Sequence, residues 1–241
     1  MKKIILSAVI ASSLIVAANA EDTAYVSHAE LGYVNTSGNT ETETFGFDGN
    51  IKKGWGKHSA TLKADAAYGK DGDKTTKKKA FAELSYDYAL TKRLAFNYVL
   101  GYKYDAFSSF DYQAYTGPGL KYKAIMEENQ TLDLTASILY SLDNNNAAGA
   151  TDSDSYSSYR LEAEYMYAFS KDVKFTQDLN YRASFEDANK YFVFSKTALT
   201  TKVSDILSAG VSYKVDYINE ANFLGKEYAD KTFLLSLILD Y

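Results

Sequence analysis

The sequence predicts an all-β fold: a single transmembrane, antiparallel, up-and-down β-barrel of 12 strands. Three observations lead to this expectation. Apolar and polar residues alternate with period two through almost the whole chain after residue 20. The alternating segments are as long as a tilted strand that crosses a bilayer. The connections between the segments are alternately short and long, which is typical of outer-membrane barrels.

Each alternating segment runs for 11 to 13 residues, about twice the usual strand length in globular proteins. In LAFNYVLGYKYD, which begins at Leu94, large apolar and aromatic residues occupy one face, and Asn97, Lys103 and Asp105 lie on the other. The tenth segment, YFVFSKTALTTKV, is the least clear, because apolar residues fall on both of its faces. The segments begin near Tyr25, Thr42, Ser59, Lys79, Leu94, Tyr112, Thr131, Ser157, Val173, Tyr191, Leu207 and Lys231.

The connections form two sets that alternate along the chain. We expect the shorter set at the periplasmic end and the longer set outside the cell, with both termini at the periplasmic end. The shorter connections are Gly54–Lys57, Leu90–Arg93, Ile125–Gln130, Ser170–Asp172 and Ser204–Ile206. The longer connections are Asn35–Thr40, Lys70–Lys78, Ala106–Asp111, Asn144–Ser155, Glu186–Lys190 and Asn219–Asp230.

The first 20 residues are typical of a secretory signal peptide, which leaves residues 21–241 as the barrel domain. Two lysines precede an apolar run from Ile4 to Ala17, and small residues flank the cleavage site after Ala20. The alternative is an uncleaved anchor, for which the run is short. The sequence therefore indicates export through the Sec pathway, cleavage, and location in the outer membrane of a Gram-negative cell. Cleavage takes the net charge from −5 to −7, which argues against nucleic-acid binding.

Aromatic residues on the apolar face gather toward the strand ends and leave aliphatic residues between them. Two such rings are favoured at the two membrane interfaces. A soluble β-sandwich, the alternative for alternating strands, has no reason to sort aromatic residues by height. At the periplasmic end we expect Tyr25, Tyr88, Phe96, Tyr122, Tyr167, Phe169, Phe175 and Tyr241. At the outer end we expect Tyr68, Tyr102, Tyr104, Tyr112, Tyr140, Tyr159, Tyr217 and Phe233.

The chain ends in KTFLLSLILDY, in which alternate residues are large and apolar. We expect this last strand to pair with the first, because unpaired backbone groups are costly in hydrocarbon. A terminal aromatic residue after alternate apolar residues also resembles the signal that the barrel-assembly machinery recognises. The residues that form this signal are Phe233, Leu235, Leu237, Leu239 and Tyr241.

Several stretches of the chain resemble the YdiY-like family, whose members are described as salt-induced outer membrane proteins. The resemblance extends from about Ala29 to Tyr241 and implies an outer-membrane β-barrel with no assigned reaction. It is carried by the order and spacing of ELGYVNTSGNTETETF, FDYQAYTGPGLKYK, FTQDLNY, KTALTTKVSDILSAGVSYKVDY and the closing strand.

No pattern in the sequence predicts an enzyme, a cofactor or a bound metal. The chain has no cysteine, which excludes thiolate metal sites and cysteine nucleophiles. We expect His58 in a solvated turn and His28 on the inward face beside Glu30, as a hydrogen-bonded lumen contact. Ser27 and His28 are consecutive strand residues, so their side chains point to opposite faces and cannot pair directly.

Three short features have weaker functional interpretations. TDSDS at residues 151–155 could bind divalent cations loosely, although such loops are usually only solvated. The lysines at Lys77–Lys79 are expected to solubilise a strand end or to contact lipopolysaccharide phosphates. Pro118 faces lipid and has no backbone N–H to donate to the neighbouring strand, so we expect a bulge or kink there.

The inward face carries 12 acids and 11 bases, so the signs nearly balance. Either water fills the lumen or the charges pair across it. We expect inward glycines such as Gly101 and Gly117 to leave room for a narrow passage. The inward charges are Glu30, Asp48, Lys52, Lys63, Asp65, Glu83, Asp87, Lys103, Asp105, Lys121, Lys123, Asp133, Arg160, Glu162, Glu164, Lys174, Asp178, Arg182, Lys196, Lys202, Lys214, Asp216 and Asp240.

Ten residues from this face are the candidate lumen site. We expect Lys103 to lie beside Lys121, and Glu162 or Glu164 to face Asp178 or Arg182. The ten are Glu30, Asp65, Glu83, Lys103, Lys121, Glu162, Glu164, Asp178, Arg182 and Lys214.

Three functions remain open at this stage. The first is a narrow passive channel for small hydrophilic solutes or ions, with little preference for one sign of charge. The second is a non-conducting structural or stress-response barrel, and the third is an outer-leaflet lipid-modifying enzyme. The partners expected in each case are outer-membrane lipids, lipopolysaccharide and the barrel-assembly machinery.

Overall fold

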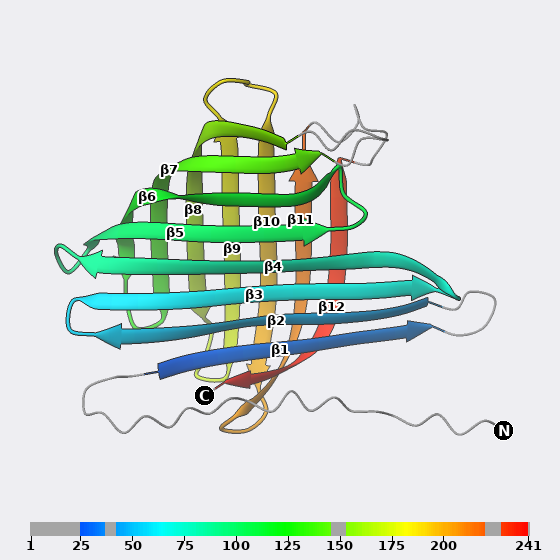
Figure 1. Ribbon diagram of the computed structural model, residues 1–241. Coiled ribbons are helices and arrows are strands. Elements are labelled where there is room, and N and C mark those ends of the chain that lie inside the picture. Colours follow the sequence, from blue (N-terminus) through cyan, green and yellow to red (C-terminus); the bar gives the residue numbers. More distant parts are fainter. Residues whose placement is uncertain (1–24, 37–41, 146–152, 220–227, 241) are drawn as a thin grey trace.

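A computed structural model describes residues 25–36, 42–145, 153–219 and 228–240. These residues form a closed barrel of twelve antiparallel strands (Figure 1), so the predicted fold class is confirmed. No helix among the described residues is long and apolar enough to cross a membrane. The strands are β1 (Tyr25–Thr36), β2 (Thr42–Trp55), β3 (His58–Asp71), β4 (Lys74–Ala89), β5 (Leu94–Asp105), β6 (Phe110–Met126), β7 (Gln130–Asn145), β8 (Ser153–Ala168), β9 (Val173–Ser184), β10 (Tyr191–Lys202), β11 (Leu207–Ile218) and β12 (Ala229–Asp240).

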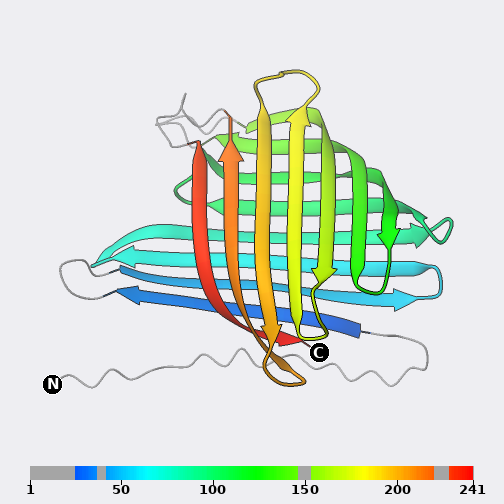
Figure 2. The same cartoon turned by 180° about the vertical axis from the view of Figure 1, so that it is seen from behind.

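Each strand pairs with its neighbours in the sequence, and β12 returns to pair with β1. The closing register places Leu31 opposite Leu237 and Gly32 opposite Ser236. Figure 2 shows β12, in red, curving toward β1, in blue. We call the end where β1 begins and β12 ends the terminal end, and the opposite end the loop end. The predicted signal peptide, the Tyr241 side chain and the centre of the predicted loop Asn144–Ser155 lie outside the described residues.

Six strands have 12 residues, within the predicted length, and the other six are longer, at 14 to 17 residues. The largest difference is at β4, which begins at Lys74 instead of near Lys79. The predicted loop Lys70–Lys78 is therefore wrong. Asp71 pairs with Lys74 across a two-residue turn in which Gly72 has φ of +56°. Glycine adopts this left-handed conformation without a steric cost, which suits a tight hairpin.

Alternate residues point to lipid and to the lumen, as the period of two requires. On β12, Leu235, Leu237 and Leu239 are more than half exposed, whereas Ile238 between them is only 2% exposed. At the loop end, outward tyrosines form a continuous row of ring contacts with centroids 5.8 to 6.0 Å apart. The row runs from β8 to the start of β12 through Tyr159, Tyr181, Tyr191, Tyr217 and Tyr228.

Pro118 interrupts pairing without shifting the register. It pairs with Tyr98 of β5, but the β6–β7 pairing has a gap between Thr116 and Gly119. The register shifts of β6 lie instead at Phe110/Tyr112 and Lys123/Ile125. The prediction of a bulge at Pro118 is therefore wrong. Proline has no backbone N–H, and the strand accommodates this by a local break in the β6–β7 pairing.

The inward glycines do not leave open space, so that expectation is wrong. A methyl group added at Gly101 would lie 2.2 Å from Cζ of Tyr115. One added at Gly117 would lie 2.1 Å from the backbone oxygen of Ile138. These glycines let neighbouring groups approach closely, and they shape the wall of the lumen instead of widening it.

Candidate functional site

Described residues line a cavity of about 590 Å³ in the lumen and a second one of about 200 Å³. Charged and polar side chains dominate the lining of the smaller cavity, whereas the larger one also has aromatic residues. Nine of the ten predicted lumen residues line the larger cavity, and Lys121 lines the smaller one. The residues that line both are Asn50, Lys63, Glu83, Asp133, Arg160, Glu162 and Glu164.

An ion pair between Arg160 and Glu83 crosses the lumen, and both residues line the two cavities. Arg160 of β8 donates to Glu83 of β4 at 2.5 Å and to Glu162 at 2.9 Å. Both Arg160 and Glu83 are almost completely buried. Tyr115 of β6 also donates to Glu83, at 2.5 Å, and its ring lies under the Arg160 guanidinium. Three strands separate β4 from β8 in the barrel wall, so these contacts span the interior.

Lys63 forms a second set of contacts across the lumen, beside those of Arg160. From β3 its ammonium group donates to Glu164 of β8 and lies 3.6 Å from Glu162. Lys121 donates to Glu164 at 3.3 Å and lies 3.5 Å from Asp133. We call the residues that these contacts join, Lys63, Glu83, Lys121, Asp133, Arg160, Glu162 and Glu164, the central network. All of its members except Lys121 line both cavities.

A second group of ion pairs lies near the closure of the barrel. Lys196 of β10 contacts Glu30 at 3.0 Å and Asp48 at 3.1 Å. Lys214 of β11 contacts Asp48 at 2.8 Å and also pairs with Asp65 of β3. Two lysines thus join β10 and β11 to β1, β2 and β3 through the lumen.

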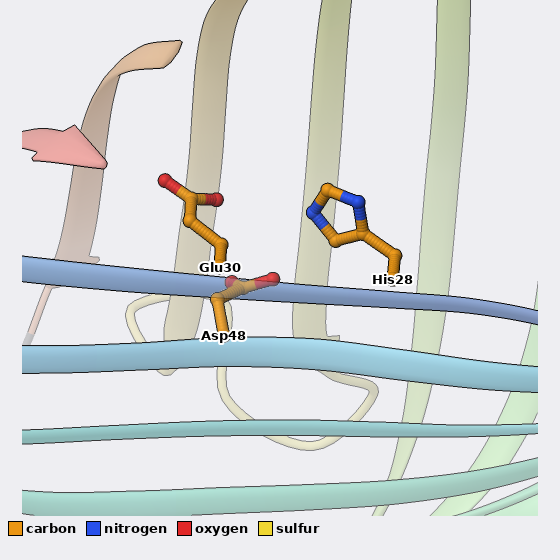
Figure 3. Close-up of side chains that lie close together, drawn as sticks. All are labelled: His28, Glu30 and Asp48. Carbon is orange, nitrogen blue, oxygen red and sulfur yellow. The ribbon is translucent and has the colours of Figure 1, made fainter. Parts of the chain in front are cut away.

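His28, Glu30 and Asp48 are the candidate metal ligands in the described part of the chain. Their ligand atoms lie within 4.8 Å of one another, and Figure 3 shows the three side chains projecting from β1 and β2. A divalent cation would have to displace Lys196 and Lys214 from the two carboxylates. We assign no metal to this cluster, since the lysines already provide the positive charge.

The loop end holds buried charges that the sequence analysis missed. Asp143 is fully buried, accepts from Tyr156 at 2.7 Å, and lies within 3.6 Å of Arg182 and Lys190. Asp143 lies at the very end of the segment predicted from Thr131 and was left out of the inward charges, although it continues the inward parity of Ser141. Neither the alternation of inward and outward residues nor the composition would have identified Lys190, because it lies just before β10 begins.

Lys77 and Lys79 face the lumen, so the interpretation of this lysine run as a solvated strand end is wrong for both. Lys79 contacts Asp216 at 3.0 Å and Asp230 at 3.2 Å, and Lys77 lies 3.5 Å from Asp230. The run begins inside β4, where side chains alternate between the two faces. Only Lys78 of the three is exposed.

The expected neighbours of Lys103 are wrong, whereas one expected acid pair is confirmed. Lys103 lies opposite Gln113, eight residues from Lys121 along β6, and it crosses the lumen to Asp216 at 2.9 Å. The two strands are antiparallel, so residues near the loop end of β5 meet those near the start of β6. Glu164 lies directly opposite Asp178, as expected.

His58 is the first residue of β3 and does not lie in a solvated turn. Its Nδ1 lies 2.6 Å from the Tyr86 hydroxyl, and its ring stacks on Trp55 with centroids 5.8 Å apart. The turn preceding it consists of Gly56 and Lys57 only. His58 therefore belongs to an aromatic cluster at the terminal end.

A family model matches residues 29–241, almost the whole described barrel. The chain belongs to DUF481, a family of proteins of unknown function. No curated protein matches the sequence. The DUF481 match therefore establishes the relationship without assigning an activity.

Solved structures with the same architecture include small porins. The NanC porin is 12% identical, with a TM-score of 0.53 over 90% of this chain and 99% of that chain. An outer membrane channel from Pseudomonas putida F1 is 8% identical, with a TM-score of 0.49 over 91% and 95%. A KdgM porin in complex with disordered oligogalacturonate is 10% identical, with a TM-score of 0.44 over 90% and 99%. The similarity to NanC shows that this DUF481 chain has the fold of an outer-membrane β-barrel.

Proposed function

We propose that the chain is a narrow passive channel for small hydrophilic solutes or ions. One observation carries the proposal: the larger cavity inside the barrel is lined by residues from both ends of the strands, such as Lys174 and Asp216, and the smaller cavity adjoins it at the central network. A lumen packed as a core would not contain cavities of this size between charged walls. Paired charges of both signs line the route, so the proposal includes only weak selection by charge.

Efflux from proteoliposomes tests the proposal. Vesicles that contain the purified barrel should lose a small ion faster than vesicles without protein, and should retain a polymer too large for the cavities. The control is a barrel of similar size that has a packed interior. Equal rates of ion loss with and without the protein would contradict the proposal.

A second function is favoured by the central network itself. Lys63 and Arg160 tie β3, β4 and β8 together across the lumen, which suits a rigid structural barrel of the envelope. In that case the network is a permanent plug and the protein does not conduct. Neither proposal assigns an enzymatic reaction, a metal or a cofactor to the chain.

We further propose the cellular setting of the barrel. The signal peptide directs export through the Sec pathway and is cleaved, and the barrel assembles among outer-membrane lipids and lipopolysaccharide. The resemblance to salt-induced outer membrane proteins extends this proposal to expression. Transcript levels should rise when cells are moved to high salt, and unchanged levels would remove that part.

The orientation of the barrel is predicted from its connections. The loop that contains Gly149 is expected outside the cell, because long connections of such barrels are extracellular. An epitope tag inserted at Gly149 should be labelled on intact cells, whereas a tag in the turn Leu90–Arg93 should require permeabilised cells. Labelling of the Leu90–Arg93 tag alone on intact cells would show the inverted orientation.

The last residue is predicted to serve barrel assembly. Phe233, Leu235, Leu237 and Leu239 all face outward and are more than half exposed, which supports a recognition strand that ends in Tyr241. Deleting Tyr241 should lower the amount of heat-modifiable barrel in the outer membrane several-fold and raise periplasmic aggregation. Changing Phe169, an exposed aromatic residue outside that strand, is the control. Normal amounts of barrel without Tyr241 would remove this role.

A further inference from the structure

Asp178, an inward acid of the larger cavity, has no direct ion-pair partner among the described residues. The Asp178 carboxylate forms no hydrogen bond or ion pair with any side chain in the described ranges. Its cross-strand neighbours are Glu164 on β8 and Lys196 on β10. Glu164 is engaged by Lys63 and Lys121, and the Lys196 ammonium binds acids on β1 and β2. The Asp178 carboxylate therefore lines the cavity without a direct partner, a position that favours a cation beside it.

An aromatic surface lies next to this carboxylate. The inward face of β10 carries Phe192 and Phe194, which line the same cavity, and this accounts for the apolar residues on both faces of that segment. Phe194 lies opposite Asn180, two residues from Asp178 on β9. Such diagonal neighbours are about 7–8 Å apart, within reach of a ligand that touches both.

Rings in this cavity already hold cations of the protein. The Arg182 guanidinium lies 4.4 Å from the centroid of Phe192 and 5.3 Å from that of Tyr115. In the described part of the chain, Phe194 has no such cation over its ring. A carboxylate beside an open ring face is the combination that recognises ammonium groups with methyl substituents. An inorganic cation would use the carboxylate alone.

We propose that the larger cavity binds a small organic cation, with Asp178 as its counter-ion and Phe194 as its aromatic contact. The cavity, at about 590 Å³, has ample room for such a molecule. The inference rests on the proposed channel for the route by which the cation arrives, and it names the solute class that the channel would hold. Figure 2 shows β9 and β10, the yellow and gold strands that carry the site, side by side in the wall.

Binding of tetramethylammonium to the purified barrel in detergent, measured by calorimetric titration, tests the site. Asp178→Asn is expected to weaken binding roughly tenfold, because a desolvated counter-ion is lost. Asp65→Asn is the matched control, since it removes the same charge from the same cavity while its carboxylate is already held by Lys214. This control should change the affinity less than about twofold. Phe194→Leu should weaken binding of tetramethylammonium while preserving the fold, which heat-modifiable migration checks.

Equal loss of affinity in Asp178→Asn and Asp65→Asn would overturn the site, since it would reveal only a general effect of charge. Absence of saturable binding to the wild-type protein would overturn it as well. Unchanged binding to Phe194→Leu would overturn the assignment to organic cations. The titration needs no membrane, so it is independent of conduction. A barrel that binds but does not conduct loses the proposed channel alone, and one that conducts but does not bind loses this inference alone.

Discussion

Replacing Arg160 with alanine is expected to lower the free energy of unfolding of the barrel by about 3–5 kcal/mol, the usual cost of breaking a buried ion pair from one side. The side chains of Arg160 and Glu83 are only 3% and 5% exposed. Without the guanidinium, the Glu83 charge stays buried with only the Tyr115 hydroxyl as a short hydrogen-bond donor. Unfolding in urea, followed by the loss of heat-modifiable migration, measures the change.

Two further variants separate this effect from general damage. Adding Glu83→Gln to Arg160→Ala should restore part of the lost stability, because the stranded charge is removed. Lys202→Ala breaks the exposed pair with Asp205 in a turn and should change the unfolding midpoint little, since exposed pairs are screened by water. An Arg160→Ala barrel as stable as the wild type would show that the crossing contributes nothing to the fold.

Replacing Lys63 with alanine is expected to open the central network while the barrel stays folded. The ammonium group of Lys63 is the link from β3 to β8. Glu164 would keep Lys121, and Glu162 would keep Arg160, so neither acid loses its last counter-ion. The side chain of Lys63 is 36% exposed. It is therefore the most exposed of the three basic side chains in the central network.

The variant should conduct better than the wild type and favour cations. Removing one positive charge about 4 Å from a passing cation in water-like surroundings is worth about 1 kcal/mol, or about a fivefold shift in relative permeability. Reversal potentials across a salt gradient measure this shift. Lys174→Ala is the control, because it removes the same charge from the wall of the larger cavity without cutting a crossing. An equal shift in relative permeability in both variants would contradict the idea that Lys63 closes the central network.

The strand pattern was predictable because a barrel in a membrane separates two solvents at every second residue. Eight of the twelve strands begin within one residue of the expected position. The parity of each strand also placed Glu30, Asp178 and Lys214 in the lumen. The largest of the four exceptions were the starts of β4 and β8, where polar residues such as Lys77 continue the strand and carry no apolar alternation.

The contacts inside the lumen were not predictable from the sequence. Partners such as Lys63 and Glu164 are about a hundred residues apart and meet only because the barrel closes with a particular register. Lys103 illustrates the limit: its position on the strand next to that of Lys121 suggested a contact between them, but the register places Lys103 beside Asp216 instead. Asp178 lacks a direct partner because its neighbour Lys196 binds other acids. This can be recognised only when the ion pairs of the lumen are known.

Single-channel recording of the wild-type protein in planar bilayers tests the central claim most directly. A lumen with charged walls that the central network crosses predicts small, discrete conductance steps with weak charge selectivity, and larger steps for Lys63→Ala. Silence of both proteins over many insertions of folded barrel would contradict the claim and would leave the central network as the permanent plug of a structural barrel.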